Sequence, residues 1–406
     1  MTSRYPSYAP SSAPWVGNIP DHWSIAPLGA VLIESKVKNT GLSETNLLSL
    51  SYGRIVPRNI NSNEGLLPES FETYQIVEPD QIVFRFTDLQ NDQRSLRSAR
   101  VTERGIVTSA YSSARPVGIH ARYAEYLMRA YDTSKVFYGL GGGVRQSLKF
   151  ADVTRIPVLR PPLDEQQAIA DYLDREAARI DTLISEQQRL IQMLRERRAA
   201  ISDRHFYARG GKRETTLRRV IRPLARPAVP GLGVVTAYRD GAVTLRSNRR
   251  DAGYTFSDTE HGYQEVRVGD LVFHALDGFA GAVGISDSHG NATPVYHVCE
   301  VISDDNPAYL AMLLRYLGVS GYLATQAPNV RQRSVDFRNW ATFARVPVAL
   351  PATDVQRDVV AEVHEQTKKI DTIIAETQKF IELAQERRSA LITAAVYGQI
   401  DVREVA

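Results

Sequence analysis

The chain has 406 residues, of which 43% are hydrophobic and 23% charged. This is long enough for two or three domains, and the composition is that of an ordinary globular protein, which excludes disordered and fibrous classes. The 49 basic and 46 acidic residues nearly balance, so net charge permits a polyanionic partner without demonstrating one.

Neither a membrane nor a disulfide is expected. No apolar run approaches the roughly 18 residues that span a bilayer, and the first residues lack the basic and apolar regions of a signal peptide. We therefore expect a cytoplasmic protein with no membrane partner. Cys299 is the only cysteine; with His297 it supplies at most two ligands where a structural zinc site uses about four, so we expect a buried thiol and no metal site.

The strongest pattern is an internal repeat, the first feature to test in a long chain. The segment Ile180 to Ala200 returns as Ile370 to Ala390 without a gap, at an offset of 190 residues. The match extends upstream at 189 residues, where Tyr74 meets Tyr263, and at 185, where Gly105 meets Gly290. The chain is therefore two diverged copies of one unit, each a globular region followed by a helix.

Both helices are expected to be long. No glycine or proline occurs from Leu163 to Arg209, which predicts a helix about 70 Å long, and the second copy runs from Ala352 to Tyr397. Apolar heptads predict a coiled-coil seam. Its members are Leu173, Ala177, Ile180, Ile184, Gln187, Ile191, Leu194, Arg198 and Ile201 in the first helix and Val363, Ile370, Ile374, Ile381 and Leu391 in the second.

The apolar seams of the two helices are most simply buried if the two helices of one chain pair antiparallel, because the pairing is then intramolecular. The apolar Leu183, Leu190, Ile373 and Phe380 are left beside the seam, which suggests an additional protein partner. We divide the chain into a globular region at 1–156, a central helix at 157–209, a second globular region at 210–346 and a C-terminal helix at 347–406.

The globular regions are predicted to be mixed α+β domains. Short apolar runs such as Gln81 to Phe86 and Asp270 to Ala275 are broken by turn residues, and short helices are expected near Tyr123 to Tyr131 and Pro307 to Leu317. The loops carry arginine and amide side chains, the groups that read guanine and adenine edges or bind phosphates. The residues that we expect to contact DNA are Arg85, Asn91, Arg94, Arg97, Arg145 and Gln146 in the first region and Arg246, Asn248, Arg249, Arg250, Arg331 and Arg333 in the second.

No catalytic centre is recognisable. The segment Gly139 to Ser147 is rich in glycine but lacks the Gly-Lys-Ser/Thr of a phosphate-binding loop. The nearest approach to an adenine-methyltransferase motif is the run from Asn306 to Tyr309, which is better explained by Asn306 as a helix N-cap and Pro307 as the first helical residue. We find no defensible nuclease motif either, so we expect no enzymatic activity in the chain itself.

Two segments resemble a known family. Val16 to Leu28 (VGNIPDHWSIAPL) looks like the start of type I restriction-modification specificity subunits, and Pro157 to Asp174 (PVLRPPLDEQQAIADYLD) looks like their helix-entry motif. The second helix entry departs from it by having Val355 where Glu165 stands in the first.

The resemblance covers essentially the whole chain. It implies two target-recognition domains that each read one half of a split target in double-stranded DNA, separated by two long helices that dock two methyltransferase (modification) subunits. Motor-nuclease (restriction) subunits would join this core. The family implies no cofactor on this chain, with S-adenosylmethionine, ATP and Mg²⁺ on the partner subunits.

Other functions are compatible with parts of the sequence. A coiled-coil scaffold would need only the helix pair, but it leaves two arginine-rich domains unexplained. A DNA adaptor outside restriction is a further alternative. A reader fused to a degenerate methyltransferase would need some 200 to 300 residues beyond those that the repeat occupies, judged by ordinary domain sizes.

Overall fold

The computed structural model describes residues 4–59, 70–87, 89, 96–139, 147–207, 213–249, 262–327, 330–331 and 334–403, with no side chains described at 330, 331 and 334. By its internal contacts the chain divides into two units, residues 1–188 with 378–406 (unit 1) and 189–377 (unit 2). Each unit therefore holds one globular region and a half of each long helix, whereas the sequence-based division kept each helix whole.

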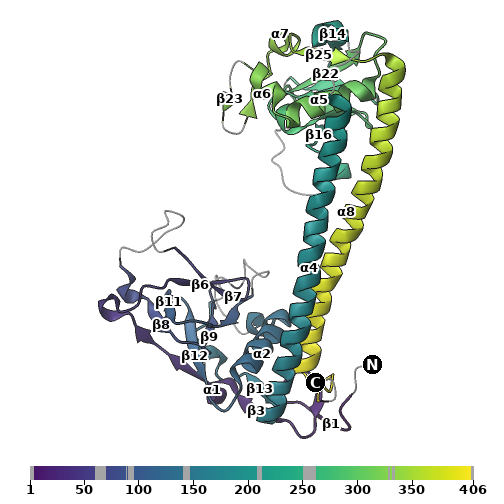
Figure 1. Cartoon of the computed structure of the whole chain (residues 1–406). Helices are drawn as coiled ribbons and strands as arrows, with labels where there is room; N and C mark the ends of the chain where they lie inside the picture. Colours follow the sequence, from purple (N-terminus) through teal and green to yellow (C-terminus); the bar gives the residue numbers. More distant parts are fainter. Residues whose placement is uncertain are drawn as a thin grey trace. The chain divides into compact units, whose positions relative to one another are not determined.

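The two longest described helices have equal length (Figure 1). Helix α4 spans Leu163–Phe206 and α8 spans Thr353–Val396, 44 residues each, so both predicted long helices are confirmed. In unit 2 the two helix segments run antiparallel, because Arg198 pairs with Asp371 and His205 lies 3.6 Å from Glu362. In unit 1 they do the same, because Asp181 pairs with Arg388 while the earlier Leu173 shares a core with the later Ile392. Arg198 thus lies in the seam as predicted, and its charge is neutralised by the facing helix.

Unit 1 is built on two small antiparallel sheets and three further strand pairs (Figure 1, purple to blue). The four-stranded sheet has the order β10-β9-β12-β4 and the three-stranded sheet the order β11-β8-β5. The first consists of β10 (Ser98–Arg100), β9 (Ile82–Phe84), β12 (Ser112–Pro116) and β4 (Leu32–Ser35); the second of β11 (Gly105–Val107), β8 (Gln75–Val77) and β5 (Val37–Lys38). The pairs are β1 (Tyr8–Pro10) with β2 (Asn18–Pro20), β3 (Ser24–Pro27) with β13 (Pro157–Arg160), and β6 (Leu48–Ser51) with β7 (Arg54–Pro57). The short helices are α1 (Leu28–Val31), α2 (Ala121–Thr133) and α3 (Phe150–Val153).

Unit 2 repeats this topology (Figure 1, teal to green). Its four-stranded sheet, read as β20-β19-β22-β15, matches β10-β9-β12-β4 strand for strand. The strands are β20 (Val283–Ile285), β19 (Leu271–His274), β22 (Tyr296–Val301) and β15 (Ile221–Pro223). The pairs are β14 (Arg213–Thr216) with β25 (Pro347–Leu350), β16 (Val235–Ala237) with β17 (Val243–Leu245), β18 (Gln264–Val266) with β21 (Gly290–Ala292), and β23 (Val330–Arg331) with β24 (Ser334–Val335). The helices are α5 (Pro307–Val319), α6 (Tyr322–Gln326) and α7 (Trp340–Phe343).

The local predictions hold where the structure describes them. Helices α2 and α5 are the two short helices expected near Tyr123 and Pro307. The Asn306 side chain accepts a hydrogen bond from the backbone N–H of Tyr309, and Pro307 begins the helix, so this segment is a capped helix start.

Each unit has its own hydrophobic core, which includes parts of the long helices. In unit 1 the last turns of α8, with Ile392 and Val396, pack into the core of the globular region. In unit 2 Phe206 of α4 does the same. Because the helix ends are part of the cores, each globular region is tied to the helix pair by apolar burial.

Candidate nucleic-acid interface

In unit 1 the described residues that flank two segments of the predicted site lie close together. The backbone N–H of Arg85 donates to the carbonyl of Arg97 over 2.8 Å, which continues the pairing of β9 with β10, and Leu148 donates to the carbonyl of Phe86 over 3.0 Å. The described ends of the segments around 88–95 and 140–146 therefore meet at one end of this sheet. Asn91, Arg94, Arg145 and Gln146 lie outside the described residues.

Arg97 is fully buried. Its Nη1 donates to the carbonyl of Thr87 over 3.0 Å and its Nε to the Tyr138 hydroxyl over 3.3 Å, while its backbone N–H donates to the Asp132 carboxylate. Burial raises the pKa of Asp132 to about 6, although the hydrogen bond from Arg97 opposes this. Burial disagrees with the prediction that Arg97 contacts DNA; its hydrogen bonds hold the base of the loop, so we leave it out of the proposed interface.

In unit 2 three predicted residues lie on a single turn, the 3₁₀ helix η5 (Arg246–Asn248) and the residue after it, which follow β17. The backbone N–H of Arg246 donates to the carbonyl of Val234 over 2.8 Å. Arg246 is half-buried, and Asn248 and Arg249 are exposed. The structure thus brings two arginines and an amide together on the hairpin of β16 and β17.

Two of these side chains already have partners within unit 2. The Asn248 amide donates to the Thr244 hydroxyl over 2.8 Å. Arg249 pairs with Asp240 at 2.7 Å and lies 4.6 Å from the centre of the Tyr238 ring, and the hydrogen bond with Asp240 raises the pKa of Arg249. The sequence analysis missed Tyr238 and Asp240, which orient Arg249; they precede it by about ten positions and only the hairpin brings them near.

The remaining predicted residues are not placed. Arg250 and Arg333 lie outside the described residues, and for Arg331 only the backbone in β23 is described. The DNA contacts themselves stay predictions for every residue of the set.

The described part of the chain holds neither a helix apolar and long enough to span a membrane nor a cluster of three or more His, Cys, Asp or Glu residues placed to hold a metal ion. Cys299 is buried, as expected, and burial raises the pKa of its thiol.

The duplicated α+β domain joined to two long helices defines a class of proteins with known structures. A chain from a type I R-M system, solved to show complex assembly and conformational transition, is 14% identical with a TM-score of 0.70, covering 93% of this chain and 98% of that one. The HsdS subunit from Thermoanaerobacter tengcongensis is also 14% identical, with a TM-score of 0.53, covering 94% and 98%. No family model and no curated protein sequence matches the chain.

The chain therefore has the fold of HsdS, the specificity subunit of type I R-M systems. This confirms, at the level of the fold, the resemblance carried by the segments that begin at Val16 and Pro157.

Proposed function

We propose that the chain is the specificity subunit of a type I restriction-modification complex and reads a bipartite sequence in double-stranded DNA. The observation that carries the proposal is the matching order of the two four-stranded sheets, each joined to the same helix pair, within a fold shared with HsdS over 94% of the chain. Because the two globular regions are related but diverged, we expect the two halves of the DNA target to differ in sequence. In unit 2 the reading surface is the turn with Arg246 and Asn248; in unit 1 it is the end of the sheet near Arg85.

Docking of two modification subunits is the second part of the proposal. The long helices expose large apolar side chains that their pairing does not cover. Away from the helix starts they include Leu183, Phe380 and Leu383 in unit 1, 38%, 44% and 54% exposed, and Met193 and Ile373 in unit 2, 50% and 42% exposed. Exposed apolar side chains along a helix pair favour a protein partner. We place methylation, ATP hydrolysis and cleavage on the partner subunits, together with S-adenosylmethionine, ATP and Mg²⁺, and the complex in the cytoplasm.

The test is methylation mapping. The chain is co-expressed with its modification subunit in a host that lacks other adenine methylation, and methylated adenines are mapped by long-read sequencing. We expect a single split motif that disappears when either subunit is omitted. A helical scaffold without DNA specificity would give no motif that depends on this chain, and this result would refute the proposal.

A further inference from the structure

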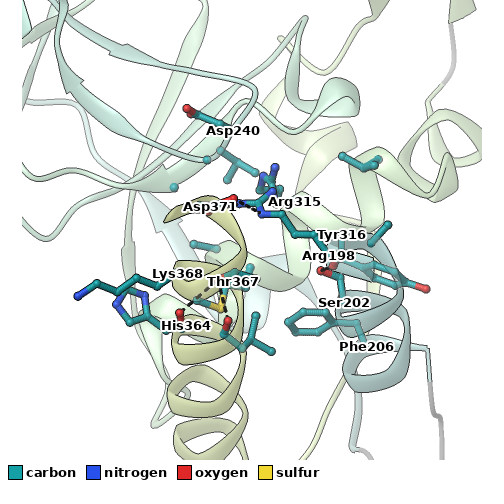
Figure 2. A pocket seen from close by; sticks show the side chains of 18 of the residues that line it. Arg198, Ser202, Phe206, Asp240, Arg315, Tyr316, His364, Thr367, Lys368 and Asp371 are labelled. Carbon is teal, nitrogen blue, oxygen red and sulfur yellow. Dashed lines mark hydrogen bonds and ion pairs between the residues drawn. The ribbon is translucent and has the colours of Figure 1, made fainter. Parts of the chain in front are cut away.

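Unit 2 contains an open pocket of about 1150 Å³ between α4, α5 and α8 (Figure 2). Its walls carry Arg198 of α4, Arg315 of α5 and Asp371 of α8, and the turn between β16 and β17 adds Asp240. Apolar side chains, among them Phe206, share the rest of the lining with further polar and charged side chains, among them Arg195, Asp203 and Lys368. A concave site with an apolar lining and a few convergent charges is typical of a ligand site.

The charges in this pocket are incompletely compensated. Arg198 pairs with Asp371 at 3.1 Å, and Asp240 pairs with Arg249 at 2.7 Å. The half-buried Arg315 donates from Nη2 to the carbonyl of Arg239 over 3.3 Å and makes no ion pair among the described residues. Burial lowers the pKa of Arg315, although the charges of Asp240 and Asp371 oppose this. A partly buried guanidinium that makes no ion pair has donors to spare, and an anion in the pocket would accept from them.

In the corresponding region of unit 1, the equivalent arginine has a carboxylate partner that Arg315 lacks among the described residues. There Arg129 stands at the position of Arg315, 186 residues earlier, and it pairs with Glu125 at 3.4 Å. Arg129 also donates to the carbonyl of Gly53 over 2.7 Å, as Arg315 does to Arg239. Both arginines therefore donate to a backbone carbonyl, but the residue at the position of Glu125 is Ala311 in unit 2.

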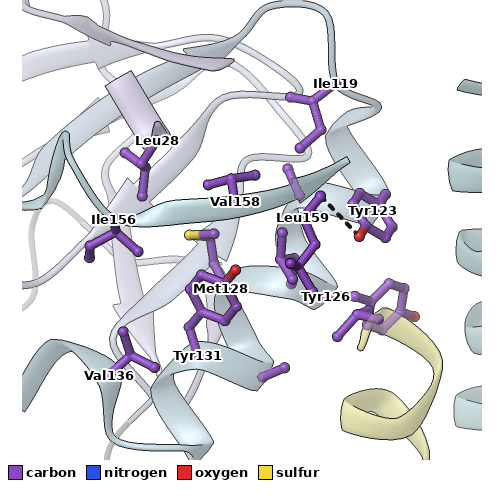
Figure 3. Close-up of a cluster of buried hydrophobic side chains, with 14 of the residues drawn as sticks. Leu28, Ile119, Tyr123, Tyr126, Met128, Tyr131, Val136, Ile156, Val158 and Leu159 are labelled. Carbon is purple, nitrogen blue, oxygen red and sulfur yellow. Dashed lines mark hydrogen bonds between the residues drawn. The ribbon is translucent and has the colours of Figure 1, made fainter. Parts of the chain in front are cut away.

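Further polar links join α2 to α4 in unit 1. Arg122 pairs with Asp171 at 2.7 Å and with Asp174 at 2.6 Å, and the hydroxyl of Tyr126, drawn in Figure 3, donates to Asp174 over 2.6 Å. At the positions of Arg122, Tyr126 and Asp174, unit 2 has Ala308, Met312 and His364, all of which line the pocket. The pocket thus occupies the region where unit 1 places bulky polar side chains.

We propose that this pocket binds a carboxylate carried on an apolar group. The carboxylate pairs with Arg315 as Glu125 pairs with Arg129, and the apolar group packs on Met312, Phe206 and Tyr316. A bare inorganic anion would leave Met312, Phe206 and Tyr316 in contact with water, whereas an apolar group on the carboxylate would cover them. The carboxylate belongs either to a small carboxylic acid or to an acidic side chain of a partner protein, and the site does not depend on the function proposed above.

The test uses the full chain labelled with ¹³C at its methionine methyl groups. Met312 lines the pocket, and Met128 in the core of unit 1 is the internal control. We expect the Met312 signal to shift saturably on addition of octanoate, to respond weakly to octanol or inorganic phosphate, and the Met128 signal to stay unchanged.

Two variants probe the charge. Arg315→Met should weaken octanoate binding roughly tenfold to a hundredfold, the effect of losing a charge-assisted hydrogen bond. Ala311→Glu should abolish binding by supplying the carboxylate from within, and it should raise the melting temperature. If octanoate leaves Met312 unchanged, or if folded Arg315→Met binds octanoate as wild type does, the proposal is wrong.

A third experiment separates the two sources of the carboxylate. Competition between octanoate and the modification subunit assigns the site to an acidic side chain of that partner, and simultaneous binding assigns it to a small molecule. Lys368→Glu, at the pocket wall, should then weaken binding of whichever ligand is found. Lys369→Glu is the matched control, because the adjacent Lys369 pairs with Glu365 at 2.7 Å and does not line the pocket.

Discussion

The two units share one topology but differ in how polar side chains are used inside it. Unit 1 buries Arg97 with Asp132, whereas unit 2 has Ala282 and Gly318 at the corresponding positions. At Gly318 an added Cβ would lie 2.2 Å from the carbonyl oxygen of Gly278, so no carboxylate fits there.

The same contrast recurs at the start of each long helix. In unit 1 the buried Glu165 accepts hydrogen bonds from Tyr5, from His22 at 2.8 Å and from Trp23 at 3.0 Å. In unit 2 the matching Val355 is 45% exposed. Both copies therefore keep the apolar periodicity that maintains the fold. The buried polar contacts have diverged, because a buried polar side chain is stable only when all of its hydrogen-bond partners are present.

The largest effect is expected at Glu165. Glu165→Ala removes the acceptor of the buried Tyr5 and Trp23 and of the exposed His22, which should destabilise unit 1 by about 3–5 kcal/mol. Val355→Ala in unit 2 is the matched control and should change stability by less than about 0.5 kcal/mol. Denaturant unfolding followed by the fluorescence of Trp23 in unit 1 and of Trp340 in unit 2 measures both. Equal loss from the two variants would contradict the contrast.

The next largest effect is expected in the free energy of unfolding of unit 1, which should depend on pH. The pKa of Asp132 is raised from 3.8 to about 6, so the folded state binds the proton more tightly than the unfolded state. Its contribution to stability is complete below about pH 4 and is lost as the pH rises through 6, a difference of roughly 3 kcal/mol at most. Asp132→Asn retains a hydrogen-bond acceptor but cannot ionise.

We therefore expect Asp132→Asn to gain stability over wild type progressively between pH 4 and 7. Unfolding of unit 1 measured at several pH values checks this. Parallel curves for the two proteins would show that Asp132 does not titrate as described.

DNA reading offers a third comparison. Alanine at Arg246 or Asn248 should relax one or two positions in one half of the methylated motif, at a cost of about 1–3 kcal/mol for each base contact, and leave the other half unchanged. The unaffected half serves as the control, and methylation mapping with competing DNA sequences provides the measurement. Relaxation of both halves together would show that these side chains do not read one half alone.

The smallest effect concerns the ion pairs of Arg122. The two carboxylates are 42% and 44% exposed, so solvent screening limits the loss in Arg122→Ala to about 1 kcal/mol. The reciprocal experiment places Ala308→Arg and His364→Asp together in unit 2, which should recover a similar amount. The gain should shrink in high salt, and a gain that does not respond to salt would point to packing instead of charge.

Much of the fold follows from the sequence because its signals are local and repeated. Helix α4 begins after Pro162 and ends before Gly210, as the absence of helix breakers predicted. The repeat offsets between Tyr74 and Tyr263 and between Gly105 and Gly290 agree with the structure, in which β8 pairs with β11 and β18 pairs with β21.

The candidate interface was less predictable. Sequence clusters correctly grouped Arg246 with Asn248 and Arg249, because neighbours on one short turn stay together in the fold. In unit 1 the same reasoning grouped Arg97 with Arg94 and Arg145, although the Arg97 side chain is buried against Thr87 and Tyr138.

By itself, the sequence determined that the chain is a duplication, where its long helices lie and which side chains form their seam, because periodicity and helix breakers act over a few neighbouring residues. Only the tertiary structure decided which charged residues are buried. Arg97 meets Asp132 in the core, and Arg122 meets Asp171 at a partly exposed site, through folding of segments distant in the chain. In unit 2 the tertiary structure also opened a pocket at Arg315, because exposure depends on the volume of facing side chains, which no local pattern encodes.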